Sequence, residues 1–89
     1  MNKIGQIIDI ISEEKTYKFS GYLKSIGIYS LDNDFTITIE DANFKVKKNC
    51  AFQLNHFFSK VSSIIIKPNS KQKVTIDYIY EYAGGNNND

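Results

Sequence analysis

The residues best able to do chemistry in this sequence are seven lysines that share a window without a single acidic residue. The window runs between Asp41 and Asp77, and acidic residues outnumber lysines on both sides of it. Clustered ammonium groups attract polyanions even when the whole chain has a net charge of only +1. The seven are Lys45, Lys47, Lys48, Lys60, Lys67, Lys71 and Lys73. This pattern predicts a basic face that binds a polyanion.

Lysine supplies every strongly basic side chain, because arginine is absent. A lysine ammonium is a flexible point charge, so it favours phosphate groups over the edges of bases. The predicted partner is single-stranded DNA, with RNA second, bound mainly through its backbone. Three rings, Tyr22, Tyr29 and Phe35, are predicted to stack on bases. The predicted binding residues are these rings together with Lys45, Lys47, Lys48, Lys67, Lys71 and Lys73.

Catalysis and metal binding find little support in the same sequence. Cys50 and His56 are the only cysteine and the only histidine, and a spacing of six residues on a predicted helix places them on different faces. One cysteine and one histidine cannot build a structural zinc site. Asp32 and Asp34 lack the glycine and final glutamate of a calcium loop, so a turn is predicted there. We therefore expect no enzyme activity, no metal and no cofactor.

The elements that must position these residues are predicted from hydrophobic spacing. Four isoleucines near the N-terminus follow helical spacing and predict a short helix: Ile4, Ile7, Ile8 and Ile11. A strand over Gln6–Ile11 is the alternative, because isoleucine is β-branched. A second helix is predicted over Cys50–Ser62, capped by Asn49. The predicted strands are a long bent one over Thr16–Ser30 and shorter ones over Phe35–Glu40, Phe44–Lys47, Ser62–Lys67 and Val74–Tyr82.

This element order predicts a mainly β, α+β domain built as a small five-stranded barrel of the oligonucleotide-binding type. A helix lies between strands three and four, and a short helix precedes the first strand. Lys45 and Lys47 are expected to point outward from the third strand, and Lys71 and Lys73 to lie in the loop joining strands four and five. In such barrels the ligand crosses strands two and three and contacts that loop. An Sm-like barrel and an open sheet with both helices on one face are the alternatives.

Size and composition predict one domain over residues 1–82, followed by a disordered tail rich in glycine and asparagine at 83–89. The single cysteine favours a reducing compartment, so a cytoplasmic protein is expected. The N-terminal isoleucine run is too short and too polar to span a membrane, and no membrane partner is expected. Abundant lysine, asparagine and isoleucine without arginine are typical of an AT-rich genome, such as that of a phage or plasmid.

A second function remains open at this point. The chain could be a protein-interaction module, such as a small phage-type inhibitor or assembly subunit. It would dock a protein partner, or another copy of itself, through its isoleucine-rich N-terminus or through an uncovered strand edge.

Overall fold

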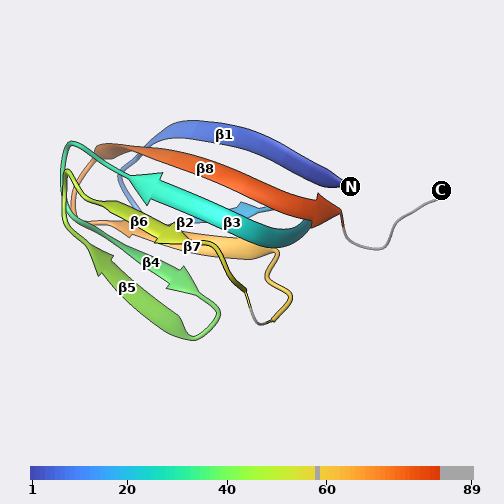
Figure 1. Cartoon of the computed structure of the whole chain (residues 1–89). Helices are drawn as coiled ribbons and strands as arrows, with labels where there is room; N and C mark the ends of the chain where they lie inside the picture. Colours follow the sequence, from blue (N-terminus) through green and yellow to red (C-terminus); the bar gives the residue numbers. More distant parts are fainter. Residues whose placement is uncertain (58, 83–89) are drawn as a thin grey trace.

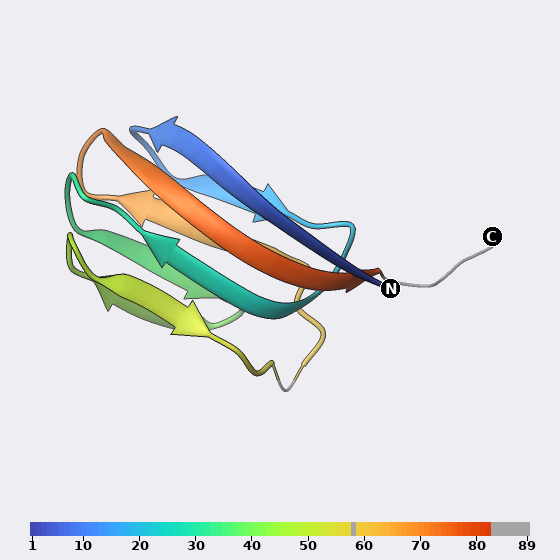
Figure 2. The same cartoon turned by 45° about the horizontal axis from the view of Figure 1, so that its top comes forward.

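Two antiparallel four-stranded sheets, stacked face to face, make up the computed structural model of this chain, which describes residues 1–57 and 59–82 (Figure 1). Sheet A has the order β1-β8-β3-β6, and sheet B has the order β2-β7-β4-β5. Sheet A consists of β1 (Asn2–Ile11), β8 (Gln72–Tyr82), β3 (Gly21–Tyr29) and β6 (Ala51–Leu54). Sheet B consists of β2 (Lys15–Lys18), β7 (Ser63–Pro68), β4 (Phe35–Ile39) and β5 (Ala42–Val46). Figure 2 shows the two layers from a second direction.

The chain crosses between the sheets at nearly every connection. Only β4 and β5 are consecutive strands of one sheet, joined by a turn at Glu40 and Asp41 in which Glu40 has a φ of 54°. β1 and β8 pair along their whole length, from Asn2 opposite Glu81 to Ile11 opposite Gln72. The first strand of the domain therefore pairs with the last one.

Alternating β-branched side chains form the core between the sheets. Ile26 and Ile28 of β3 and Ile76 of β8 face Ile37 of β4 and Ile66 of β7, and none is more than 1% exposed. Isoleucine suits this position because its stiff, branched side chain packs well on a pleated surface. The abundance of isoleucine thus accounts for an all-strand fold.

A bulge in β3 changes which residues face the core. Leu23 pairs with Tyr80, but the next paired residue is Ser25, opposite Ile79, so Lys24 is the extra residue. Before the bulge the odd-numbered Leu23 is buried, and after it the even-numbered Ile26 is buried. A bulge inserts one residue and resets the alternation of faces in this way.

The predicted N-terminal helix is wrong, because residues 2–11 form β1. Ile7 and Ile11 face the core side, whereas Ile4, Ile8 and Ile10 point outward and are exposed. Isoleucines on both faces of a strand reproduce, by coincidence, the three- and four-residue spacing of a helix. The β-branched character that favoured the alternative strand decided the outcome.

The predicted helix over Cys50–Ser62 is also wrong. Its first part forms β6, in which Phe52 and Leu54 are half-buried while Gln53 is exposed, which is the two-residue period of a strand. Phe57 and Val61 pack against the core from an irregular segment. Phe58, which also falls within the predicted helix, lies outside the described residues.

The oligonucleotide-binding barrel, the Sm-like barrel and the open sheet covered by helices are all excluded by this architecture. No helix is present in residues 1–57 and 59–82, and hence none there could cross a membrane. The long strand predicted over Thr16–Ser30 is two strands, β2 in sheet B and β3 in sheet A. The last four predicted strands correspond to β4, β5, β7 and β8. The predicted tail at 83–89 lies outside the described residues.

Candidate ligand-binding site

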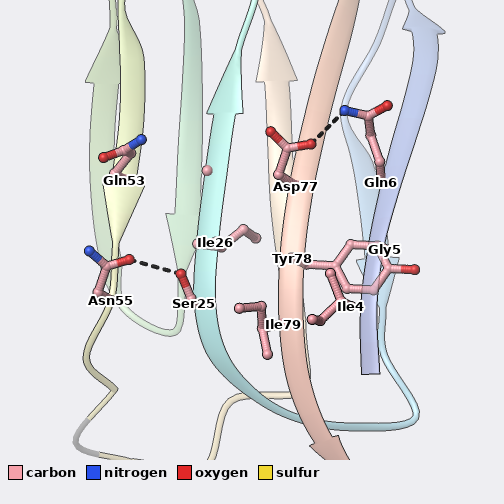
Figure 3. A pocket seen from close by; sticks show the side chains of 11 residues that line it. Ile4, Gly5, Gln6, Ser25, Ile26, Gln53, Asn55, Asp77, Tyr78 and Ile79 are labelled. Carbon is pink, nitrogen blue, oxygen red and sulfur yellow. Dashed lines mark hydrogen bonds between the residues drawn. The ribbon is translucent and has the colours of Figure 1, made fainter. Parts of the chain in front are cut away.

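A depression crosses the outer face of sheet A, and we call it the trough (Figure 3). Its volume is about 600 Å³, within the range typical of small-molecule sites. All four strands of the sheet contribute to it. The lining residues are Ile4, Gly5, Gln6, Ser25, Ile26, Gly27, Gln53, Asn55, Asp77, Tyr78 and Ile79.

The trough exists because the middle of β3 carries almost no side chain on this face. Gly27 pairs with Gln53 on one side and with Asp77 on the other, so it lies at the centre of the sheet. A Cβ atom at Gly27 would lie at ordinary contact distance, 3.9 Å from Gln53 Cγ and from the Phe52 carbonyl oxygen, so the position has room for a methyl group. The small Ser25 precedes Gly27 on the same face. Longer side chains on β1, β8 and β6 form the walls around this floor.

Polar groups of the trough come mainly from amides. Gln6 Nε2 donates a hydrogen bond of 2.7 Å to Asp77 Oδ1, and Ser25 Oγ donates one of 2.8 Å to Asn55 Oδ1 (Figure 3). Gln53 adds a third amide, which is exposed. Amides both donate and accept, so this set can match a ligand that does the same. Asp77 is the only charged side chain of the lining.

Apolar surface completes the walls. Ile4 is 74% exposed on β1, and Ile79 faces it from the paired position on β8. Tyr29 lies two residues beyond Gly27 on the same face of β3 and is 38% exposed. A ligand lying along β3 could therefore contact amides at one end and a ring at the other.

Tyr78 and Gly5 fix the geometry of β1 beside the trough. They are directly opposite each other, and the Tyr78 ring lies against Gly5 (Figure 3). A Cβ atom on Gly5 would fall 2.3 Å from the tyrosine hydroxyl, so only glycine leaves this ring its place. Phe19 packs on the same ring, with centroids 5.1 Å apart.

A second depression of about 330 Å³ opens between the edges of the two sheets. It is mostly apolar, with Phe44 of β5 and Leu54 of β6 among its lining, and Ser59 Oγ donates a 2.6 Å hydrogen bond to Glu40 at its rim. Phe44 also packs against Phe52, with centroids 4.9 Å apart. We call this depression the edge recess.

The lysines do not gather on one face. Lys45 and Lys67 lie on either side of Thr36 on the outer face of sheet B, so Lys45 points outward from its strand. Lys47 follows β5 and lines a small depression beside Thr36. Lys73 lies on the opposite side of the molecule, on the outer face of sheet A, where it pairs with Ile10.

The remaining predicted contacts are dispersed. Lys48 lies in the loop after β5, and its backbone N–H donates to Asp34 Oδ1. Lys71 lies in the turn before β8. Of the predicted stacking rings, Phe35 is 1% exposed in the core, and Tyr22 is half-buried with the Lys60 ammonium 5.4 Å from its centroid. None of the three rings therefore stands beside Lys45 and Lys67.

A charged cluster links the two sheets at one edge. Asp9 of β1 accepts hydrogen bonds from the Lys15 ammonium and, at 2.9 Å, from the Tyr17 hydroxyl of β2. The hydrogen bond from Lys15 is the main cause that holds the pKa of Asp9 below its ordinary value of 3.8. Burial, followed by the hydrogen bond to Asp9, raises the pKa of Tyr17 above its ordinary value of 10.0.

No metal-binding constellation was found in residues 1–57 and 59–82, where no three His, Cys, Asp or Glu side chains come together. Cys50 is a free, exposed thiol in the loop before β6. The residues described thus offer no ligand set for a transition metal.

The trough was missed at the sequence level for a clear reason. Its residues come from four segments, and only the register of β1, β8, β3 and β6 unites them. A weak signal was present, because Gly27 interrupts a strand whose other outward residues are larger. Glycine within a strand often marks a place where a ligand or another backbone approaches closely.

Solved structures resemble this fold closely enough to assign it. A conserved protein of unknown function from Pseudomonas aeruginosa PAO1 matches with a TM-score of 0.72 at 5% identity, covering 89% of this chain and 40% of that one. A cupin-2 domain containing protein from Shewanella frigidimarina matches with a TM-score of 0.58 at 12% identity, covering 86% and 71%. The cupin domain of Cnp3 from Schizosaccharomyces pombe matches with a TM-score of 0.54 at 18% identity, covering 91% and 56%.

These likenesses show the fold alone: a cupin-like double-stranded β-helix, or jelly roll, of two antiparallel sheets. The chain spans only 40% of the Pseudomonas protein and 56% of the Cnp3 domain. No protein-family model matches the sequence. No curated protein is detectably similar to it either.

The fold corrects the predicted function. A single-stranded nucleic-acid-binding protein was predicted from the lysine window together with an oligonucleotide-binding barrel, and that barrel is replaced by a cupin-like sandwich. The lysine window is continuous in sequence, but the strands place its members on both outer faces. The new fold gives no support to the alternative function either, that of a phage-type inhibitor or assembly subunit.

Proposed function

We propose that this protein is a non-enzymatic binding domain that holds a small, neutral, hydroxyl-rich molecule, a saccharide or similar polyol, in the trough of sheet A. The observation that carries the proposal is the ring of amide, hydroxyl and carboxylate groups around the bare floor at Gly27. Vicinal hydroxyls of a polyol both donate and accept hydrogen bonds. A side-chain amide or carboxylate can bind two neighbouring hydroxyls at once.

The charge of the site favours a neutral ligand. Asp77 is the only charged lining residue, and its carboxylate can accept hydrogen bonds from the hydroxyl groups of a neutral ligand. No ammonium group lines the trough, which disfavours a phosphate or carboxylate ligand.

The apolar walls suit the carbon face of a sugar. Ile4 and Ile79 can cover C–H groups of a ring whose hydroxyls reach Gln53 and Asn55. Tyr29 would extend this contact for a longer ligand. The trough is open and its polar groups are exposed, so the expected dissociation constant for a disaccharide is weak, about 0.1–1 mM.

The compartment forms part of the same proposal. The unpaired, exposed Cys50 is compatible with a reducing environment, and we place the protein in the cytoplasm. An NMR spectrum of the labelled protein in intact cells of the host would test this placement.

The test is a titration of the ¹⁵N-labelled protein with cellobiose, maltose and sorbitol, followed by amide chemical shifts. The expected result is a saturable shift confined to the amides of residues such as Ser25, Gly27, Gln53 and Asp77. Shifts confined to the edge recess, at residues such as Phe44 and Leu54, would assign the ligand to that site and overturn the proposal. No shift with any of the three probes at 20 mM, about twenty times the weakest expected dissociation constant, would also overturn it.

A matched pair of variants makes the titration specific. Gly27→Trp fills the floor of the trough and is expected to weaken binding at least tenfold. Thr36→Trp adds the same side chain to sheet B at an equivalent place, because Thr36 also pairs with a residue on both neighbouring strands. Equal binding by wild type and Gly27→Trp would contradict the assignment of the trough.

A further inference from the structure

The four sheet edges of the described structure are not protected equally. Three are short: β2 and β6 have four residues each, and β5 has five. Short edge strands and lysine are common devices against unwanted pairing, and β2 and β5 both carry lysine. β1 also carries one lysine, Lys3, but it differs in length, because it presents ten residues and pairs with β8 in unbroken register. Its free edge therefore offers a long, regular row of backbone donors and acceptors.

The outward face of β1 is also unusually apolar. Ile4, Ile8 and Ile10 are 74%, 60% and 63% exposed. Single exposed apolar residues are common, but three lie along this one face of a free edge strand and form a strip interrupted only by Gln6. An uncovered edge with such a strip is a template for another strand.

We propose that two copies of this protein pair through β1, antiparallel, around a two-fold axis that passes through Gln6. In this register Ile4 lies opposite Ile8 of the second copy, and the symmetry forms this contact twice. Lys3 likewise lies opposite Asp9 of the second copy. Apolar pairs and opposite charges across an antiparallel pair both stabilise it.

Charge and apolar complementarity select this register over its neighbours. An axis at Gly5 would place Ile4 opposite Gln6. An axis at Ile7 would pair Ile4 with Ile10, but it would place Gln6 opposite Ile8 and Lys3 opposite Ile11. Asp9 already accepts hydrogen bonds from Lys15 and Tyr17, so Lys3 of the second copy would add a second cation to a carboxylate whose position is fixed. Only the axis at Gln6 joins apolar to apolar and cation to anion.

Two-fold pairing also covers the exposed edge of β1, which could otherwise aggregate with further chains. A symmetric β1–β1 contact uses the same surface on both copies and closes, so it does not propagate into a fibre. The product is a continuous eight-stranded sheet with a trough on each half. This inference does not rest on the ligand proposed above, although Ile4 and Gln6 also line the trough; Ile8, the other half of the apolar pair, lies outside it.

Cysteine cross-linking tests the register directly. In a Cys50→Ser background, Gln6→Cys places two thiols across the axis, where Cα atoms about 4.5–5.5 Å apart fall within disulfide range. The expected result is near-complete disulfide dimer on mild oxidation. Ile10→Cys in the same background is the control, since Ile10 would face Asn2 of the second copy and cross-link at least tenfold more slowly. Equal cross-linking at the two positions would overturn the register.

Sedimentation and light scattering across a range of concentrations test the dimer itself. Wild type is expected to dimerise, and Ile8→Lys is expected to raise the dissociation constant at least tenfold. Leu31→Lys removes an apolar side chain of similar exposure, 63%, away from β1 and should leave the dimer unchanged. A monomeric wild type at every concentration, or an unchanged dimer in Ile8→Lys, would contradict the proposal. Circular dichroism of each variant confirms that the fold is retained.

Discussion

Gly27 of sheet A and Thr36 of sheet B occupy equivalent places, yet their surroundings differ. Each lies on an inner strand, opposite one residue of each neighbouring strand. The cross-strand neighbours of Thr36 are Lys45 and Lys67. The cross-strand neighbours of Gly27 are Gln53 and Asp77, and Gly27 itself has no side chain between them. The inner faces of the two sheets are alike, and the outer faces are not.

This difference separates what the fold requires from what it permits. Both inner faces must supply branched apolar side chains, because the two sheets share one core. The outer positions carry no such demand, and sheet B fills them with threonine and lysine, as an ordinary solvated sheet does. Sheet A carries amides, a bare floor and an isoleucine strip there, which is why we place the functional surfaces on it.

The largest loss of folding stability is expected from substitutions in the core, to which both sheets contribute alike. Ile28→Ala in sheet A and Ile37→Ala in sheet B each remove a side chain that is 0% exposed. Each is expected to lower the free energy of unfolding by about 3–4 kcal/mol, through lost burial and the cavity left behind. Urea denaturation measures both values. A loss confined to one sheet would show that the core is not shared as described.

Two glycines of β3 in sheet A are expected to respond differently to substitution by alanine. A Cβ atom on Gly21 would fall 2.1 Å from the backbone oxygen of Glu81, so Gly21→Ala must move a paired strand and should cost about 2–3 kcal/mol. Gly27→Ala adds a methyl group at ordinary contact distance, 3.9 Å from its nearest neighbours, and should be neutral or stabilising by about 0.5 kcal/mol. Thermal unfolding of the two variants measures this contrast. Equal destabilisation would mean that Gly27 is structural and that the trough is not a free surface.

The smallest loss of folding stability is expected in the charged cluster of Asp9, Lys15 and Tyr17, which joins the two sheets. The lowered pKa of Asp9 means that its ionised form stabilises the fold above pH 3.8, and this contribution is lost as the pH falls through the lowered value. Asp9→Asn should cost about 1 kcal/mol at pH 7, because Tyr17 and Lys15 lose a charged acceptor. Denaturation at pH 7 and at pH 2 should show this difference shrinking toward zero. A difference that persists at pH 2 would rule out ionisation as its cause.

Strands with clean alternation could be predicted from the sequence, and those with apolar residues on both faces could not. Phe35, Ile37 and Ile39 alternate with threonines, and β4 is where they indicated. In β1 the outward isoleucines imitated helical spacing, since nothing in the sequence marks a face as exposed. The bulge at Lys24 and the crossing between Lys18 and Gly21 were equally hidden, because both depend on partners far along the chain.

The functional surfaces were predictable only in part. The outward orientation of Lys45 and the isoleucine-rich N-terminus followed from local pattern. The trough did not, since Gln6, Gln53 and Asp77 become neighbours only through pairing in sheet A. A charge window continuous along the chain was a poor guide to a surface, because adjacent strands alternate between two sheets.

The pairing of β1 with β8 has a consequence for how the protein is made. Within this domain β1 is synthesised before every other strand and its partner β8 after them all, so sheet A cannot be completed until the whole domain has emerged. Long-range strand pairing of this kind is slow. During that interval both edges of β1, with isoleucines on both faces, stay unpaired. Chaperone dependence and aggregation in fast expression should therefore originate at residues 2–11, before any native surface exists.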